Sequence, residues 1–490
     1  MDTEAAVRAI ASVRELPEWL TPLRALASVE DAPHTVFLES GGEGGESADW
    51  TILAFDPAWR LELRDGALVR YENGRARRLD GHPLEALRSA WPERAEVLGA
   101  PPAPFLSGLA GYLGYDFKDW IERYPDRALR EWTLPDLSLG FYDVVWAWRR
   151  STGEGWAVSS GLGARDERGL EDRARVRLEE QWQRIEGGAA GGSSAARVAG
   201  AGLAASGPSC AAPTVRSNFT REAYCRMVET ALGHIAAGDV YQVNLAQRFL
   251  VQSAPPPAAV FRALREAAPA PFLAFVALDE AGIASSSPER FFRIQGRRIE
   301  TWPVKGTRPR GKTPEEDDAL RAELIASAKD RAENVMIVDL ERNDLGRVCE
   351  VGSVRVPALC EVTSHSNVHH FVSRVEGTLR PDAGPVDVLR ALFPGGSITG
   401  TPKIRSVEII DALEPVRRGV YTGAIGYWDV GGDCDWNIAI RTIVAGGGVA
   451  SFHAGGGIVA ESTPEAEYEE TLVKATGMMR ALGVSTSPRR

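Results

Sequence analysis

The sequence predicts an α+β fold built from antiparallel β-sheets. Strand-like and helix-like segments follow one another in a mixed order, which disfavours the regular strand-helix alternation of a parallel sheet. Short apolar runs are separated by Asp65-Gly66 and Asn73-Gly74, and both dipeptides are strong hairpin-turn signals. The chain has 490 residues, of which 44% are hydrophobic, so it can build a large core in two or three domains, or in one large domain with an extra layer.

The first part of the chain, residues 1–186, is expected to form a β-rich domain. It is followed at 187–217 by a segment that is almost entirely Ala, Gly and Ser. Such a composition cannot bury a core, so we predict a flexible linker there. The expected elements of the first part are strands near 34–40 and 50–55, two short strands at the turns named above, a hairpin over Tyr142–Arg149 and Trp156–Ser160, and a charged helix over about 166–185.

The second part, residues 218–484, is expected to form a larger domain. Thr220 is a suitable N-cap for a helix that ends near Gly238. The other expected helices cover 256–267, 315–345, 385–392, 402–413 and 464–482, and the expected strands cover 240–252, 272–278, 290–303, 423–430 and 435–453.

Composition argues against several classes of protein. The formal net charge is −11 without a dominant basic patch, so nucleic acid and anionic membranes are poor candidate partners. The segment Met1–Leu20 lacks a signal-peptide core, and no apolar run is long enough to span a bilayer. The five cysteines are scattered without a C-x-x-C pair, which favours a reduced cytoplasmic protein without structural zinc.

Lys305 lies in the most informative segment, Thr301–Arg310. Pro303 and Pro309 stiffen its flanks, and Gly306 allows the backbone to approach a ligand. A lysine held in this way can act as a nucleophile if its amine is partly neutral. The alternative is an ordinary surface lysine in a turn.

Two predicted helices each carry a pair of acidic residues on one face. Asp330 and Glu333 are three residues apart, and Glu467 and Glu470 repeat that spacing. Four carboxylates from two helices could hold a hard cation, and oxygen-only ligands suit Mg²⁺. Two solvated acidic faces remain the alternative, because spacing does not show that the helices meet.

Further candidates for ligand binding surround these helices. Gly455, Gly456 and Gly457 let backbone N–H groups approach an anion. Arg441 could grip a carboxylate with two hydrogen bonds. Lys474 follows Glu470 by four residues, so an intrahelical ion pair is its simpler role.

Three more residues are candidates on their own segments. Glu289 precedes Lys305 by a strand-turn-strand distance and could act as a general acid, although an ion pair with Arg290 or Arg298 is the simpler role. Thr399 lies in the loop Gly395–Lys403, which leads into a helix N-terminus, a favourable place for an anionic ligand. His370 lies in an alternating strand pattern, where a histidine is commonly a hydrogen-bonded core residue.

Together these segments resemble the chorismate-utilising enzymes, which include anthranilate synthase component I, aminodeoxychorismate synthase component I and the isochorismate and salicylate synthases. The resemblance covers 218–482 closely and the N-terminal part more loosely, and it implies two facing antiparallel sheets wrapped by helices. The matching segments are Phe37–Gly41, Gly108–Asp116, Gly238–Phe249, Ser287–Phe291, Lys305–Arg310, Glu333–Val348, Pro394–Lys403 and Ala454–Ser462.

The resemblance implies roles for the candidate residues. Glu333 and Glu470 would bind Mg²⁺ directly, supported by Glu467 and by Asp330, where the family usually has glutamate. His370 would lie near the substrate ring. The residues that would bind chorismate are Gly306, Thr307, Tyr421, Arg441, Gly455, Gly456, Gly457 and Lys474.

Two positions separate the reactions within that family. Members that add water carry a lysine base where this chain has Gln242, and a glutamine cannot take a proton from water. Anthranilate synthases generally carry alanine where this chain has Lys305, whereas aminodeoxychorismate synthases carry lysine. The resemblance therefore implies amination of chorismate at C4 through a covalent intermediate on Lys305, with Glu289 as the acid.

The resemblance also implies partners. The chain has no recognisable glutaminase segment, so a separate glutamine amidotransferase subunit would supply ammonia, and an aminodeoxychorismate lyase would use the product for 4-aminobenzoate and folate. Glu39, Ser40, Pro271 and Phe272 correspond to the family's tryptophan-binding element. The alternatives are anthranilate synthase component I and a non-catalytic paralogue that binds chorismate.

Overall fold

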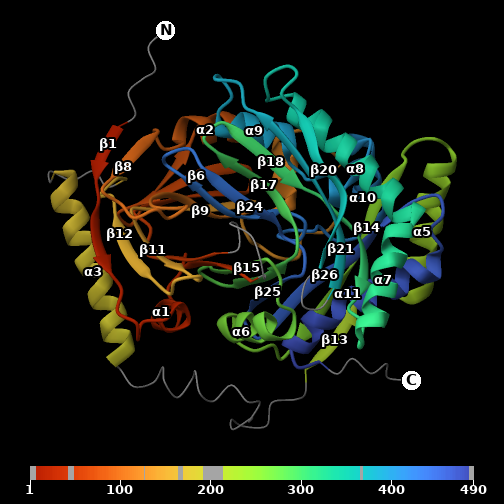
Figure 1. The fold of residues 1–490 in the computed structure, drawn as a ribbon, viewed down its shortest axis with the longest axis horizontal. Coiled ribbons are helices and arrows are strands. Elements are labelled where there is room, and N and C mark those ends of the chain that lie inside the picture. Colours follow the sequence, from red (N-terminus) through yellow and green to blue (C-terminus); the bar gives the residue numbers. More distant parts are fainter. Residues whose placement is uncertain are drawn as a thin grey trace.

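The computed structural model describes residues 7–41, 49–125, 127–163, 169–190, 213–364 and 368–484. Two large antiparallel sheets, each of 12 strands, face one another, and helices cover their outer surfaces (Figure 1). The expected fold class, α+β with two facing antiparallel sheets wrapped by helices, is confirmed. A short parallel pair, β1 (Val7–Ile10) and β8 (Ala95–Leu98), lies outside both sheets.

Sheet I contains strands from both ends of the chain. Its order is β13-β14-β26-β25-β16-β15-β3-β4-β11-β12-β2, and β22 pairs with β14. The strands are β2 (Ser12–Glu15), β3 (Val36–Ser40), β4 (Trp50–Ala54), β11 (Val144–Arg149), β12 (Gly155–Ser159), β13 (Thr214–Ser217), β14 (Gln242–Gln252), β15 (Phe272–Ala277), β16 (Gly282–Ser287), β22 (Gly400–Thr401), β25 (Thr442–Gly446) and β26 (Val449–Ile458).

Sheet II has the same mixed origin. Its order is β19-β21-β18-β17-β24-β23-β9-β10-β5-β6-β7, and β20 pairs with β21. The strands are β5 (Trp59–Arg64), β6 (Ala67–Glu72), β7 (Arg75–Leu79), β9 (Gly108–Leu113), β10 (Leu137–Tyr142), β17 (Arg290–Gln295), β18 (Arg298–Trp302), β19 (Val304–Pro309), β20 (Arg355–Ser364), β21 (Val368–Thr378), β23 (Ala424–Asp429) and β24 (Cys434–Ile438).

The helices begin at recognisable capping signals. Thr21, Thr220, Thr313 and Ser327 each accept a backbone N–H of the first turn through the side chain, as N-caps do. The α-helices are α1 (Pro22–Val29), α2 (Pro83–Ala90), α3 (Leu170–Ala190), α5 (Arg221–Ala236), α6 (Pro257–Ala267), α7 (Pro314–Ala326), α8 (Ala328–Gly346), α9 (Pro385–Leu392), α10 (Lys403–Leu413) and α11 (Pro464–Ala481), and the 3₁₀ helices are η2 (Tyr115–Trp120) and η3 (Gly396–Ile398).

The core lies in three layers, because successive side chains of a strand point to opposite faces. Val36 of β3 packs between the sheets with Tyr112 of β9, whereas the next residue, Phe37, packs outward with Phe261 of α6. α1, α3, α6 and α11 cover sheet I. α2, α8 and α9 cover sheet II.

The predicted N-terminal and C-terminal domains do not correspond to the two sheets. Strands from residues 1–186 and from 218–484 are hydrogen-bonded neighbours in both, as in β3 with β15 and β9 with β23. Within the predicted linker, residues 187–190 belong to α3 and 214–217 form β13. The rest of it, 191–212, lies outside the described residues.

Three predicted elements are subdivided in the structure. The single helix expected over 315–345 is two helices, because Ser327 ends α7 and caps α8. The strand expected over 290–303 is the hairpin of β17 and β18, which turns at Gly296 with φ +60°. The strand expected over 435–453 is divided among β24, β25 and β26.

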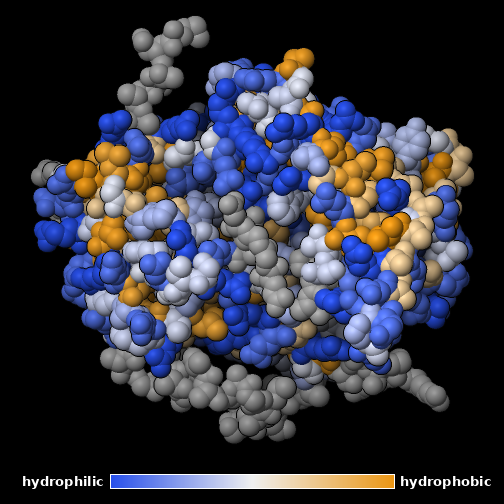
Figure 2. Space-filling view, in the orientation of Figure 1, coloured by the Kyte–Doolittle hydropathy of each residue, from blue (hydrophilic) through white to orange (hydrophobic). Residues whose placement is uncertain are grey.

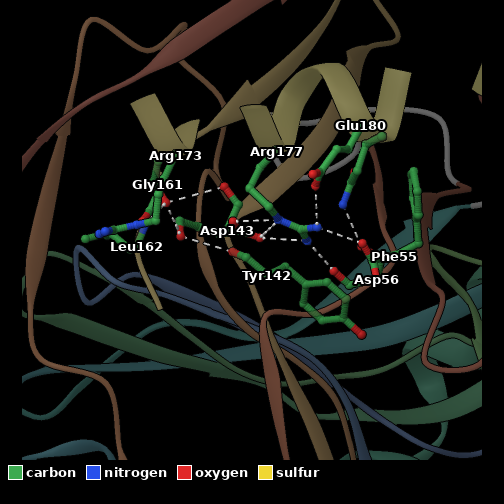
Figure 3. Close-up of polar contacts among 12 residues, drawn as sticks. Phe55, Asp56, Tyr142, Asp143, Gly161, Leu162, Arg173, Arg177 and Glu180 are labelled. Carbon is green, nitrogen blue, oxygen red and sulfur yellow. Dashed lines mark hydrogen bonds and ion pairs between the residues drawn. The ribbon is translucent and has the colours of Figure 1, made fainter. Parts of the chain in front are cut away.

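The long helix α3 is attached to sheet I and its turns by a buried ion pair (Figure 3). The Arg177 guanidinium donates to Asp143 Oδ2 at 3.1 Å and to Asp56 Oδ2 at 2.8 Å. Gln181, one turn later, donates to the Phe55 carbonyl oxygen at 2.9 Å. Asp143 is fully buried, so its charge depends on Arg177 for compensation.

The surface is mainly hydrophilic on the face drawn in Figure 2, with apolar patches around β1 and β8 and around α8 and α10. Among the described residues, no helix is both long enough and apolar enough to cross a membrane.

Candidate active site

The predicted functional residues gather where the β19 edge of sheet II meets α8, α11 and the glycine-rich end of β26. Lys305 lies on β19 and Glu289 just before β17, while α8 carries Asp330 and Glu333. α11 packs on β26 and α8 packs on β19. The structure thus brings both acidic helices to one site, which spacing alone left open.

Lys305 is directed into this site. Its Nζ donates to the Ser397 carbonyl oxygen at 3.1 Å. Burial lowers the pKa of the Lys305 amine, and the carboxylates of Glu333 and Glu289 act in the opposite direction without cancelling it. A partly buried lysine with a lowered pKa supplies more of the neutral amine that a nucleophile requires.

Glu289 is buried beside Lys305 and is not paired with Arg290 or Arg298. Burial raises the pKa of the Glu289 carboxyl, while hydrogen bonds from Ser397 and the Val304 backbone and the charge of Lys305 oppose that rise. Its Oε1 makes no hydrogen bond within the described residues. Arg290 instead pairs with Asp435, so the simpler ion-pair role is wrong and a proton-donating role fits the environment.

Glu333 on α8 lies among charges of both signs. Burial raises the pKa of its carboxyl, with Asp330 and Glu467 adding to the rise and Lys305 and Lys329 opposing it. Asp330, one turn earlier, accepts from Arg308 at 3.1 Å. The two pairs of acidic residues therefore influence one another electrostatically.

The carboxylates of α11 lie against the glycines of β26. A Cβ at Gly456 would come within 3.1 Å of Glu467 Oε2 and 3.3 Å of Glu470 Oε1, so any other residue there would crowd them. Burial acts to raise the pKa of Glu470, but Lys474, 2.6 Å from its Oε1, outweighs this and the pKa is lowered. Lys474 also donates to the Gly455 carbonyl oxygen at 2.9 Å, so the predicted intrahelical pair is present and extends to the glycine strand.

Arg441 lies within electrostatic reach of both Tyr421 and Glu470. Burial lowers the pKa of Arg441, while Tyr421 and Glu470 act to raise it. Arg441 has a left-handed backbone, with φ 51°, which is uncommon for a residue other than glycine and is concentrated at functional sites. The Tyr421 ring stacks on His453 with centroids 5.0 Å apart.

Gln242 begins β14 beside the glycine strand. Its side chain is fully buried, and neither its Oε1 nor its Nε2 has a hydrogen-bond partner among the described residues. A Cβ at Gly457 would lie 2.7 Å from that Nε2. A buried amide without partners is costly, so Gln242 is a candidate to contact a ligand of the site.

His370 on β21 contacts the Lys305 segment directly. Its Nδ1 lies 3.0 Å from Thr307 Oγ1 and 3.3 Å from the Gly306 carbonyl oxygen. Gly306 has φ +69°, and a Cβ there would lie 3.0 Å from the Cβ of Asp330. The His370 contacts therefore join β21 to β19, and glycine at 306 lets β19 lie close to α8.

Thr399 and Ser397 lie in the loop that follows α9. The Thr399 hydroxyl donates to the Gly395 carbonyl oxygen at 2.8 Å, so it shapes the loop, and its role in substrate binding stays a prediction. Sequence reasoning missed Ser397, which contacts both Lys305 and Glu289. Its position inside the glycine-rich loop was the available signal.

The four residues of the predicted tryptophan element also come together. Ser40 of β3 and Phe272 of β15 are paired in register. Glu39, Ser40, Pro271 and Phe272 line one cavity of about 170 Å³ between the sheets. Arg265 binds the Glu39 carboxylate through two nitrogens.

Chemically, the main site combines a neutralisable amine, a buried carboxylic acid, a group of carboxylates and cationic side chains that can hold an anion. Such a site can bind an anionic ligand, attack it with Lys305 and protonate a leaving group with Glu289.

Comparison with known proteins supports this interpretation. The family model for chorismate binding enzymes matches residues 33–480. Aminodeoxychorismate synthase component 1 of Bacillus subtilis is 38% identical over 453 residues, covering 92% of each chain. Anthranilate synthase component 1 of Thermus thermophilus is also 38% identical, over 471 residues that cover 94% of this chain and 95% of that one.

A solved structure agrees. The crystal structure of anthranilate synthase component I from Streptococcus pneumoniae superposes with a TM-score of 0.73 at 30% identity, covering 89% of this chain and 93% of that one. The chain therefore belongs to the family of chorismate-binding enzymes, as an enzyme of the anthranilate synthase and aminodeoxychorismate synthase type.

Proposed function

We propose that the protein is aminodeoxychorismate synthase component I, which converts chorismate and ammonia to 4-amino-4-deoxychorismate. The observation that carries the proposal is the placement of Lys305, whose amine lies in the site beside the buried acid Glu289. The partly buried position and the lowered pKa of Lys305 support a covalent role.

In the proposed reaction, the neutral amine of Lys305 forms a bond to C2 of chorismate. The ring double bonds shift, the bond from C4 to its hydroxyl oxygen breaks, and Glu289 gives its proton to that oxygen, which leaves as water. Ammonia then adds at C4, and the bond from C2 to Lys305 breaks to return the neutral amine. The proton lost by the new ammonium restores Glu289, so the sum is chorismate plus ammonia to product plus water.

Gln242 supports ammonia rather than water as the nucleophile. Its unpartnered amide lies beside Gly457, where a general base would be needed to activate water. An amide cannot remove a proton at neutral pH, whereas ammonia is already nucleophilic.

The site fits Mg²⁺ by its donor chemistry. Glu467 on α11 is buried and Glu333 on α8 is partly buried, and Glu467 raises the pKa of Glu333 while Glu470 raises that of Glu467. A divalent cation would relieve this repulsion and would neutralise a substrate carboxylate. Within the described chain these four side chains do not converge within 4.8 Å of one another, so binding would require their rotation. Glu333 and Glu470 would bind the ion, with Asp330 and Glu467 in support.

The partners follow from the proposed reaction. A glutamine amidotransferase subunit would supply ammonia. Exposed apolar side chains lie next to site residues and could contact such a subunit: Tyr241 precedes Gln242, Val473 precedes Lys474, and Val335 follows Glu333 by two residues. An aminodeoxychorismate lyase would consume the product. The four described cysteines are free thiols, which supports a cytoplasmic location.

Tryptophan is the proposed occupant of the cavity lined by Glu39, Ser40, Pro271 and Phe272. The cavity is between the sheets and is separate from Lys305. Binding would be detected by isothermal titration with tryptophan, and an unchanged affinity in Phe272→Ala would contradict this assignment.

The activity test uses purified protein with chorismate, Mg²⁺ and ammonium at alkaline pH, with and without aminodeoxychorismate lyase. We expect 4-aminobenzoate only when lyase is present. Fluorescent anthranilate formed without lyase would refute the proposal and would establish anthranilate synthase, the second candidate. That candidate is favoured by the equal identity of the Thermus thermophilus relative.

A further inference from the structure

A second cluster of metal-ligand side chains lies far from Lys305, where the middle of sheet I faces the β5 end of sheet II. His34 precedes β3 in sheet I, Asp279 lies in the turn between β15 and β16, and Glu62 lies on β5 of sheet II. β5 is eight strands from β19 in the sheet order, which corresponds to roughly 38 Å along the sheet. We call these three residues the His34 cluster.

The ligand atoms of the His34 cluster converge. One nitrogen or oxygen from each side chain lies within 4.8 Å of those from the other two, and this is the sole group of three such side chains found among the described residues. His34 Nε2 is 3.5 Å from Asp279 Oδ1. That separation exceeds an ordinary hydrogen bond but resembles the roughly 3.4 Å between two ligands of one tetrahedral Zn²⁺.

The imidazole of His34 is buried and available as a ligand. Its exposure is 6%, and Nε2 makes no hydrogen bond within the described residues.

The backbone holds His34 in this position against its own preference. Its φ of 59° is left-handed. The His34 N–H donates to the Ala277 carbonyl oxygen at 2.8 Å, and the Tyr142 hydroxyl donates to the His34 carbonyl oxygen at 2.6 Å. A strained residue fixed in this way with an unpartnered ring nitrogen is typical of a functional site.

Arg60 is the competing cation, but it does not replace a metal. Its Nε is 3.4 Å from Glu62 Oε1 and its Nη2 is 3.6 Å from Asp279 Oδ2, so it forms long ion pairs with both carboxylates and not short hydrogen bonds. Its guanidinium lies over the Tyr71 ring at 4.1 Å, and this contact holds the guanidinium to one side of the three ligand atoms. The other oxygen of Asp279, Oδ1, faces His34. Each carboxylate oxygen of Glu62 has two lone pairs, so the contacts with Arg60 and Arg64 leave lone pairs free to bind a metal.

We propose that His34, Glu62 and Asp279 bind one Zn²⁺ ion that joins sheet I to sheet II. A neutral imidazole with two carboxylates suits Zn²⁺ and related first-row ions, whereas Mg²⁺ and Ca²⁺ prefer oxygen alone. The sequence-based expectation of no structural zinc rested on cysteine spacing and does not apply to this type of ligand set. The ion is separate from the proposed Mg²⁺ site and from chorismate turnover.

The test compares zinc binding by the full chain with binding by single variants. Metal-free protein is titrated with Zn²⁺ against a chromophoric chelator in saturating Mg²⁺, and melting temperature is recorded with and without Zn²⁺. We expect Asp279→Asn to bind one equivalent of Zn²⁺ fewer than the unaltered protein, or to bind it at least tenfold more weakly. Zn²⁺ should raise the melting temperature of the unaltered protein but not that of Asp279→Asn. Because the side chain of Asp279 is half-exposed, we expect this variant to fold normally and its chorismate turnover to be unchanged.

Two further variants make the result decisive. His34→Gln should weaken binding in the same way. His234→Gln should not, because His234 faces Asp239 at 2.7 Å but has no second carboxylate ligand grouped with it in the described chain. Absence of zinc binding, or equal binding by the unaltered protein, Asp279→Asn and His34→Gln, would overturn the proposal.

Discussion

Replacing Glu341 with glutamine tests how far burial controls ionisation beside the proposed active site. Glu341 lies on α8 between Glu333 and Asp344, with an exposure of 8%. Thr301 donates a hydrogen bond to it. Burial raises the pKa of Glu341 to about 8, with the charges of Glu289 and Asp344 adding to the rise. Glutamine keeps the shape and the acceptor but cannot ionise.

The linkage between proton binding and folding gives the size of the effect. An acid whose pKa is 4.5 when unfolded and about 8 when folded favours the folded state fully below pH 4.5, and this advantage disappears as pH rises through about 8. At pH 7 the loss is roughly 3 kcal/mol. With roughly 2.1 cal/mol/K of unfolding entropy per residue over 490 residues, that corresponds to a melting-temperature difference of about 3 °C.

The assay is thermal melting of the unaltered protein and Glu341→Gln from pH 5 to pH 9. We expect similar melting temperatures near pH 5 and an advantage for the variant that grows to about 3 °C at pH 7. Asp339→Asn on the same helix is the matched control, because the Asp339 side chain is 77% exposed and should give no pH-dependent difference. Parallel profiles for Glu341→Gln and the unaltered protein would refute the reasoning.

Three further predictions address the site and the fold. Lys305→Ala should form aminodeoxychorismate at least a hundredfold more slowly, and unchanged kinetics would exclude a covalent role. In the unaltered protein the rate should rise with pH through a pKa below 10.5, because the pKa of Lys305 is lowered. Glu470→Gln should raise the Mg²⁺ concentration for half-maximal rate at least tenfold, whereas Glu469→Gln, which removes an exposed partner of Arg221, should not. Arg177→Met should destabilise folding by about 3–5 kcal/mol, because it leaves Asp143 buried without a counter-charge, and adding Asp143→Asn should restore most of this loss in urea unfolding.

The site residues that could be predicted from sequence are those whose side-chain chemistry and whose spacing along the chain both indicate a function. Glu467 and Glu470 share a helix face because they are three residues apart, and Gly456 marks the strand that lies against them. Lys305 was identified because prolines and glycine surround it. These signals are local, so they can be read without the fold.

The parts that could not be predicted depend on contacts between distant segments. Glu341 is separated by 40 residues from Thr301, its hydrogen-bond donor, and nothing in the helix pattern distinguishes it from an exposed glutamate. The same holds for Arg177 and Asp143, which are 34 residues apart. The break between α7 and α8 was missed because Ser327 lies in a continuous helix-forming composition, where only its capping geometry identifies the boundary.

The shared sheets explain why the N-terminal part cannot be regarded as a separate accessory domain. Every residue of the proposed catalytic and Mg²⁺ site comes from 218–484, yet β9 from the N-terminal part pairs along its full length with β23, which follows Tyr421. Tyr115, which follows β9, donates its backbone N–H to the Gly419 carbonyl oxygen at 2.6 Å, two residues before Tyr421. The N-terminal strands therefore hold the segment that carries Tyr421, so a fragment beginning at 218 would lack this support and should fail to bind chorismate even though it keeps every residue of the proposed site.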